Sequence, residues 1–141
     1  DMAYRPSRVN IDGKSKTETR VSDADIMPGT AIKIVDNKFV QATAADYGKT
    51  EVYVANVAVL QGLTATDAIP AGDSIEGEYL DDSRCLAVIG IAGEKWTKDA
   101  GLTIGADGAF ALEADAPILF AQEDFTIPAQ GNKLAVAKVA N

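Results

Sequence analysis

The chain has 141 residues, 47% of them hydrophobic and 24% charged, so it is long enough to bury the core of one domain without disulfide bonds. It has no histidine and one cysteine, which excludes much of the nucleophilic catalysis and transition-metal binding that depend on these residues. A net charge of −8 argues against nucleic acid as a direct partner. Because the usual catalytic residues are scarce, we expect a binding or structural protein rather than an enzyme.

The first 25 residues are polar and locally basic. Residues 1–20 contain five basic and three acidic side chains, a local charge of +2, which leaves −10 on the remainder. Large apolar side chains are few there and show no helical spacing. We therefore expect residues 1–25 to form an extended N-terminal arm outside the core, with a solvated, disordered terminus as the alternative. The segment also lacks the apolar centre of a signal peptide.

From Ile26 onward, turn signals alternate with short apolar runs, which predicts a single β-rich domain over residues 26–141. Residues 31–35 and 39–42 form a predicted hairpin around the reversal at 36–38. Residues 44–48 predict one short helical turn. The run 52–60 is rich in β-branched residues and predicts the strongest strand, with a bulge or with burial on both faces.

The second half continues this pattern. Strands are predicted over 74–80, 84–91, 117–121 and 134–139, and a hairpin over 102–112 reverses at Asp-Gly. Residues 94–100 predict a short helix or a loop carrying Trp96. No apolar run is long enough for a membrane helix. The sequence thus predicts an all-β fold, a small β-barrel or β-sandwich of short antiparallel strands with at most one or two short helices.

Candidate chemistry is weak throughout the chain. Paired acids could act as a glycosidase does, but solvation explains both Asp81/Asp82 and Glu76/Glu78 better. Residues 23–25 lack the remaining ligands of a calcium loop. The glycines form no phosphate-binding motif, and Cys85 reads as a buried structural thiol. We expect no catalytic residue, no metal and no cofactor.

Two aromatic residues allow one further alternative. Trp96 and Tyr79 could line a carbohydrate platform, in which case sugars would change the tryptophan fluorescence. Single aromatic residues in β proteins are more often core or rim residues, and no aromatic cluster supports sugar binding. A glycan- or ligand-binding β module therefore stays an alternative rather than the main interpretation.

The turn and strand pattern of the body resembles a known family. Residues 26–34, which read IMPGTAIKI, and 36–40, which read DNKFV, are similar to the opening of capsid decoration (cement) proteins of tailed bacteriophages. The later stretch 68–75, AIPAGDSI, is similar as well. The likeness covers most of residues 26–140 and consists of turn motifs rather than a catalytic signature.

The resemblance implies a structural virion protein. Members of this family are non-enzymatic, bind the outer surface of the capsid and stabilise the head by bridging neighbouring major capsid subunits. It further implies a homo-trimer on the capsid, synthesis in the host cytoplasm and no membrane partner. Other virion β-proteins, such as a tail-tube or head-fibre base component, are the alternatives.

An extended arm could add to the exposed sheet edge of a neighbouring protein and so dock on the shell. We expect the basic and apolar residues of the arm to carry this docking: Tyr4, Arg5, Arg8, Val9, Ile11, Lys14, Lys16 and Arg20. On this hypothesis, deletion of residues 1–20 leaves the body folded and abolishes shell binding.

Overall fold

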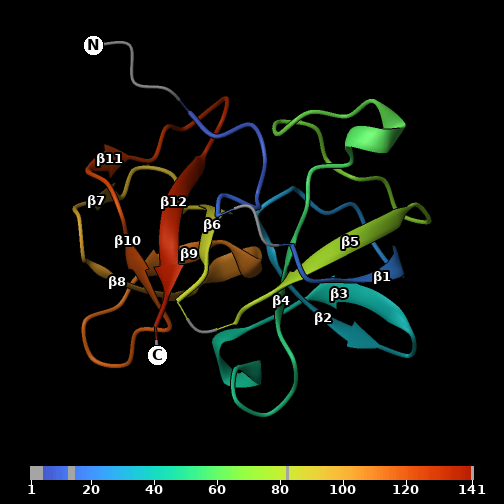
Figure 1. Ribbon diagram of the computed structural model, residues 1–141, viewed down its shortest axis with the longest axis horizontal. Helices are drawn as coiled ribbons and strands as arrows, with labels where there is room; N and C mark the ends of the chain where they lie inside the picture. Colours follow the sequence, from blue (N-terminus) through green and yellow to red (C-terminus); the bar gives the residue numbers. More distant parts are fainter. Residues whose placement is uncertain (1–4, 13–14, 82, 141) are drawn as a thin grey trace.

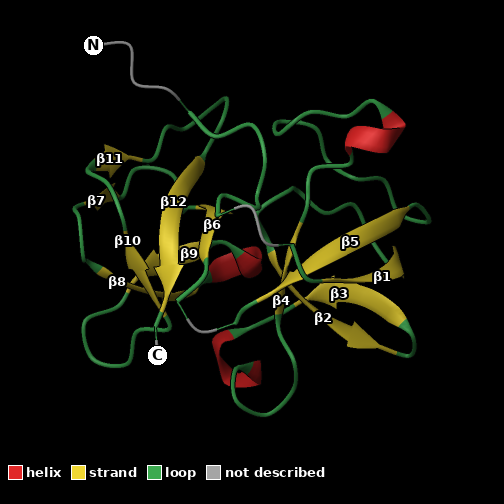
Figure 2. Cartoon of the chain, viewed as in Figure 1, coloured by secondary structure: helices red, strands yellow, loops and turns green. Residues whose placement is uncertain are grey.

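The computed structural model describes residues 5–12, 15–81 and 83–140. Figure 1 shows two β-rich lobes side by side, with β1–β5 in one and β6–β12 in the other. The predicted all-β class is confirmed, because the helical elements of the described chain are three 3-10 turns (Figure 2). These turns are η1 (Ala44–Asp46), η2 (Val59–Gln61) and η3 (Ala106–Gly108).

The first lobe is a closed five-stranded barrel with the strand order β1-β3-β2-β4-β5. Its neighbours pair antiparallel, except that β1 and β3 run parallel. The predicted hairpin is confirmed as β2 and β3, and Asp36 and Asn37 at its tip adopt φ values of 51° and 65°. Positive φ at both central residues matches the right-handed twist of the strands. The five strands are β1 (Thr17–Ser22), β2 (Ala31–Val35), β3 (Lys38–Gln41), β4 (Tyr53–Ala55) and β5 (Ser74–Tyr79).

An aromatic cluster fills the barrel. The ring centroids of Phe39 and Tyr53 lie 5.4 Å apart, and those of Tyr53 and Tyr79 lie 4.9 Å apart, both edge to face. Burial, with the Tyr79 hydroxyl nearby, raises the pKa of Tyr53 to about 12. Gly77 makes room for these rings, because a Cβ there would lie 2.8 Å from Cζ of Phe39.

The second lobe is a five-stranded sheet with the order β6-β12-β10-β8-β9, next to a two-stranded sheet of β11 and β7. The predicted hairpin over 102–112 is confirmed as β8 and β9, with Asp107 and Gly108 at positive φ. Residues 94–100 contain no helix, and Trp96 is instead a buried residue of β7. The strands are β6 (Cys85–Ile89), β7 (Lys95–Trp96), β8 (Gly101–Ile104), β9 (Phe110–Leu112), β10 (Leu119–Ala121), β11 (Phe125–Thr126) and β12 (Leu134–Val139).

Side chains of the two lobes pack against each other at their junction. The core of the second lobe includes Ala31 and Val54 from the outside of the barrel. Gly29, in the predicted turn before β2, donates its N–H to Ala55 O at 2.8 Å and accepts from Ile89 N at 3.0 Å. Its φ is 87°, and a Cβ there would lie 2.7 Å from the Ile89 nitrogen, so only glycine fits between the lobes.

The expectation that residues 1–25 lie outside the core is wrong for two parts of this segment. Residues 17–22 are barrel strand β1, which pairs with β5 from Thr17 opposite Glu78 to Val21 opposite Ser74. Val9 is 0% exposed, and its carbonyl accepts from Ala87 N at 2.8 Å, so residues 9–11 extend the second sheet beyond β6. Both parts are held in the sheets by backbone hydrogen bonds, which a search for apolar spacing does not detect.

The long strand predicted over 52–60 is also wrong in its second half. Only Tyr53–Ala55 forms strand β4, because its partner register on β5 ends at Gly77. The chain then leaves the barrel and forms η2. The apolar run therefore continues past the sheet, and its last two residues, Val59 and Leu60, are exposed.

Candidate functional site

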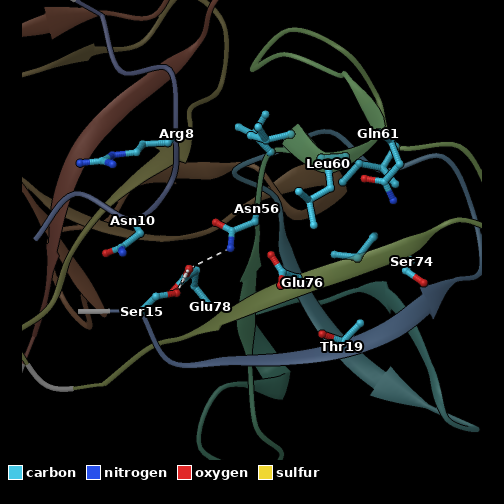
Figure 3. A pocket seen from close by; sticks show the side chains of 15 residues that line it. Arg8, Asn10, Ser15, Thr19, Asn56, Leu60, Gln61, Ser74, Glu76 and Glu78 are labelled. Carbon is cyan, nitrogen blue, oxygen red and sulfur yellow. Dashed lines mark hydrogen bonds between the residues drawn. The ribbon is translucent and has the colours of Figure 1, made fainter. Parts of the chain in front are cut away.

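A groove of about 350 Å³ runs along the outer face of β1 and β5. Figure 3 shows its two walls, the η2 loop on one side and Arg8, Asn10 and Ser15 on the other. Thr19 and Glu76 lie opposite each other in the β1–β5 register and form the floor, together with Ser74 and Glu78. The groove therefore combines strands of the barrel with the segment that joins the barrel to the second lobe.

Glu78 is the buried acid at one end of the groove. Its side chain is 1% exposed, and its Oε2 accepts from Ser15 Oγ at 2.7 Å and from Asn56 Nδ2 at 2.8 Å (Figure 3). Its Oε1 lies 3.0 Å from Arg84 Nη1. The predicted solvated Glu76/Glu78 pair is thus wrong for Glu78, whose charge is matched by Arg84 and two neutral donors.

Arg84 connects this acid to the N-terminal segment. Its Nη2 donates to Asn10 Oδ1 at 2.9 Å and lies 3.6 Å from Asp12 Oδ1, while Nη1 also reaches the Tyr79 carbonyl at 3.2 Å. The buried Arg84 Nε has no hydrogen-bond partner within the described residues. This network holds Asn10, Asp12 and Ser15 against both lobes and so sets one wall of the groove.

The opposite wall ends in an exposed apolar tip, which consists of Val59 and Leu60. Val59 is 65% exposed and Leu60 is 96% exposed. Hydrogen bonds from Gln61 N and Leu63 N to Ala58 O, at 3.2 and 3.1 Å, hold the backbone of the tip. Below it, the groove is lined by the buried apolar residues Val57, Ile69 and Ile75.

Two charged side chains of the groove have no ion-pair partner within the part of the chain that the structure describes. Arg8 lies on the N-terminal wall and Glu76 on the floor, and both are exposed. The Arg8 guanidinium points away from the floor, so of these two charges only that of Glu76 faces the groove (Figure 3).

Among the residues expected to dock on the capsid, Arg5 instead binds side chains of its own fold. Its guanidinium lies 2.9 and 2.6 Å from the two carboxylate oxygens of Glu123 and stacks 3.6 Å from the centroid of the Phe125 ring. Burial alone would raise the pKa of Glu123, but Arg5 and the Val136 N–H hold that pKa below its ordinary value. Arg5 thus anchors the N-terminal segment on the second lobe.

The other expected docking residues are spread over the surface and the core. Val9 is buried and Ile11 is half-buried, whereas Lys16 is exposed and lies 3.7 Å from Asp81. Arg20 pairs with Glu18 at 2.6 Å and with the hairpin tip. Tyr4 and Lys14 lie outside the described residues. Among the described residues of this set, only Arg8 lines the groove, and its guanidinium points away from the floor (Figure 3).

The alternative sites receive little support. Trp96 is 0% exposed and donates to Glu94 Oε1 at 3.0 Å, so it cannot form a sugar platform. Asp82 lies outside the described residues, and Asp25 accepts a hydrogen bond from the Ala71 N–H in a loop. The described residues contain no group of three or more potential metal ligands and no helix long and apolar enough to cross a membrane.

Comparison with known proteins finds the likeness at the level of the fold. No protein-family model matches the sequence, and no curated protein is similar to it. Among solved structures, the chain is similar to the N base of the head fibre protein gp8.5 of bacteriophage phi29. The two share 18% sequence identity with a TM-score of 0.52, over 90% of this chain and 95% of that chain. At this identity the likeness shows a shared fold.

Proposed function

We propose that this chain is a structural protein of a phage head, which binds the outer surface of the capsid and bridges neighbouring major capsid subunits. The observation that carries the proposal is the fold shared over 90% of the chain with a phage head-fibre base. The turn motifs that resemble capsid decoration proteins support it independently. The proposal makes the chain a non-enzymatic component of the virion, acting as a homo-trimer.

The same likeness favours a second candidate, the base of a head fibre. As a base, the chain would bind the shell and would also hold a fibre on its outer side. The two candidates differ in what the chain holds on its outer side, and both require a capsid-facing surface.

The test is to mix the purified chain with undecorated, expanded heads of the phage that encodes it. We expect the chain to sediment with the heads, to appear as density on their outer surface in electron micrographs, and to raise the temperature at which they disrupt. Light scattering of the unbound chain reports whether it is a trimer. Heads that stay bare at saturating concentrations of the chain would contradict both candidates.

A further inference from the structure

We propose that the groove and the apolar tip beside it form the capsid-binding surface, and that they bind an extended segment of the major capsid protein. This segment carries an apolar side chain and, next to it, a basic one. The inference rests on the proposed function and names the place and the chemistry of the contact.

The apolar tip is presented in a fixed conformation. The turn is closed by backbone hydrogen bonds, including Gly62 N to Val59 O at 2.9 Å, and Gly62 takes the left-handed conformation that ends it. None of these bonds involves the side chains of Val59 or Leu60. A leucine that is 96% exposed on this hydrogen-bonded turn adds little to the fold itself, whereas its burial by a partner would be favourable.

The groove below the tip can receive one or two side chains. Its volume of about 350 Å³ is at the lower end of the range for pockets that enclose small ligands, about 300–1,000 Å³. Val57 and Leu60 supply apolar lining, whereas Ile69 and Ile75, each 1% exposed, lie beneath it as part of the barrel core. An apolar side chain of the partner inserted here would be covered by Leu60, as the anchor residues of protein interfaces are.

The charge of the groove floor determines which side chain the partner needs beside its apolar residue. Glu78 is already neutralised by Arg84, so the unpaired acid of the floor is Glu76. A lysine or arginine of the partner would pair with Glu76. Arg8 takes no part in this contact, because its guanidinium points away from the floor (Figure 3).

The mode of binding differs from strand addition. Strand β5 already has β1 on one side and β4 on the other, because the barrel is closed. The groove lies on the face of these strands and not on an edge. Recognition must then come from side chains, so it depends on the residues of the tip and the floor.

The test compares four full-length variants for binding to the same expanded heads. Leu60→Ser removes the apolar tip, and Glu76→Lys inverts the charge of the floor. The matched controls are Leu112→Ser, an exposed leucine of β9, and Glu51→Lys, an exposed acid outside the groove. Circular dichroism and thermal melts confirm that each variant is folded, which we expect because the four side chains are exposed.

We expect Leu60→Ser and Glu76→Lys each to weaken binding about tenfold or more, while both controls bind as the unmodified chain does. If all four variants bind equally, the inference is overturned and the proposed function stands. If the unmodified chain does not bind, both are overturned. If Leu60→Ser dissociates an oligomer of the free chain and leaves head binding intact, the tip contacts a second copy and the inference is again overturned.

Discussion

Arg84 and Glu78 form a buried ion pair at the junction of the two lobes, with 3.0 Å between Nη1 and Oε1 and exposures of 8% and 1%. Removing one partner leaves the other charge buried and unpaired. We therefore expect Arg84→Ala to lower the free energy of unfolding by about 3–5 kcal/mol, measured by urea denaturation. Lys98→Ala serves as the control, because Lys98 pairs with Asp99 on the exposed surface and should cost less than about 1 kcal/mol. Equal losses in the two variants would contradict this assignment.

The contact between Arg5 and Glu123 should make stability depend on pH. The folded-state pKa of Glu123 is below its ordinary value of 4.5. The ionised carboxylate therefore stabilises the fold fully above about pH 4.5, and this stabilisation is lost as the pH falls through the lowered folded-state pKa. We expect Arg5→Ala to cost about 1–3 kcal/mol at pH 7, since both side chains are partly exposed, and less at pH 3. Urea denaturation at the two pH values measures the difference. In Glu123→Gln, the effect of Arg5→Ala should no longer change between them.

Deletion of residues 1–20 should unfold the barrel rather than leave it intact. The deletion removes Thr17–Arg20, which pair with β5, and Val9, which lies in the core. This expectation reverses the one drawn from the sequence. Far-ultraviolet circular dichroism and the amide dispersion of an NMR spectrum measure it. A deletion variant that keeps the native spectrum would show that β1 is dispensable.

Gly77→Ala should destabilise the barrel by overpacking. The added methyl group would lie 2.8 Å from Cζ of Phe39 and 2.9 Å from Cβ of Tyr53. We expect a loss of about 1–3 kcal/mol in the free energy of unfolding, measured by thermal and urea denaturation. Phe39→Leu removes the Cζ atom, so the double variant should lose less than the sum of the two single variants. Strict additivity would argue against the close approach.

The single tryptophan offers a direct test of the glycan-binding alternative. Trp96 is 0% exposed, so its emission should lie at short wavelength and acrylamide should quench it weakly until the protein unfolds. We expect addition of mono- and oligosaccharides to leave this emission unchanged. A saturable change with one sugar would show that the ring is reached by a ligand.

Local patterns in the sequence predicted the elements whose partners are close in the chain. The β2–β3 hairpin follows from the reversal at Asp36 and Asn37, and the β8–β9 hairpin follows from Asp107-Gly108. Both depend on turn geometry that the residues themselves favour. The predicted strand over 134–139 agrees with β12 for a different reason, because the sequence there is almost entirely apolar, although its partner β6 is distant in the chain.

Strand β1 could not be predicted in this way. Glu18 and Arg20 lie on the same face of the β1–β5 pair as Gly77 and Ile75, so the inward positions are polar and the apolar alternation is absent. An ion pair between them and the Tyr79 hydroxyl, 3.2 Å from Glu18, take the place of apolar contacts. A pattern based on hydrophobicity has no means of detecting such a strand.

The candidate site was missed for two further reasons. Glu78 alternates with Glu76 along β5, and the sequence does not show that Ser15 and Arg84 cover only one of the two. Val59 and Leu60 read as the end of a strand, because the sequence does not show where the pairing of β4 stops. In both cases the deciding partner is distant in the chain.

The barrel is closed between strands that are far apart in the chain, and Ser15 and Glu78 beside this closure are 63 residues apart. During synthesis the polar β1 leaves the ribosome well before its partner β5 exists, so it must remain unpaired on that side until translation has passed Tyr79. Contacts of such long range slow the folding of β proteins. A nascent chain halted before Tyr79 would therefore have an open barrel, and the low hydrophobicity of β1 would help to keep that intermediate soluble.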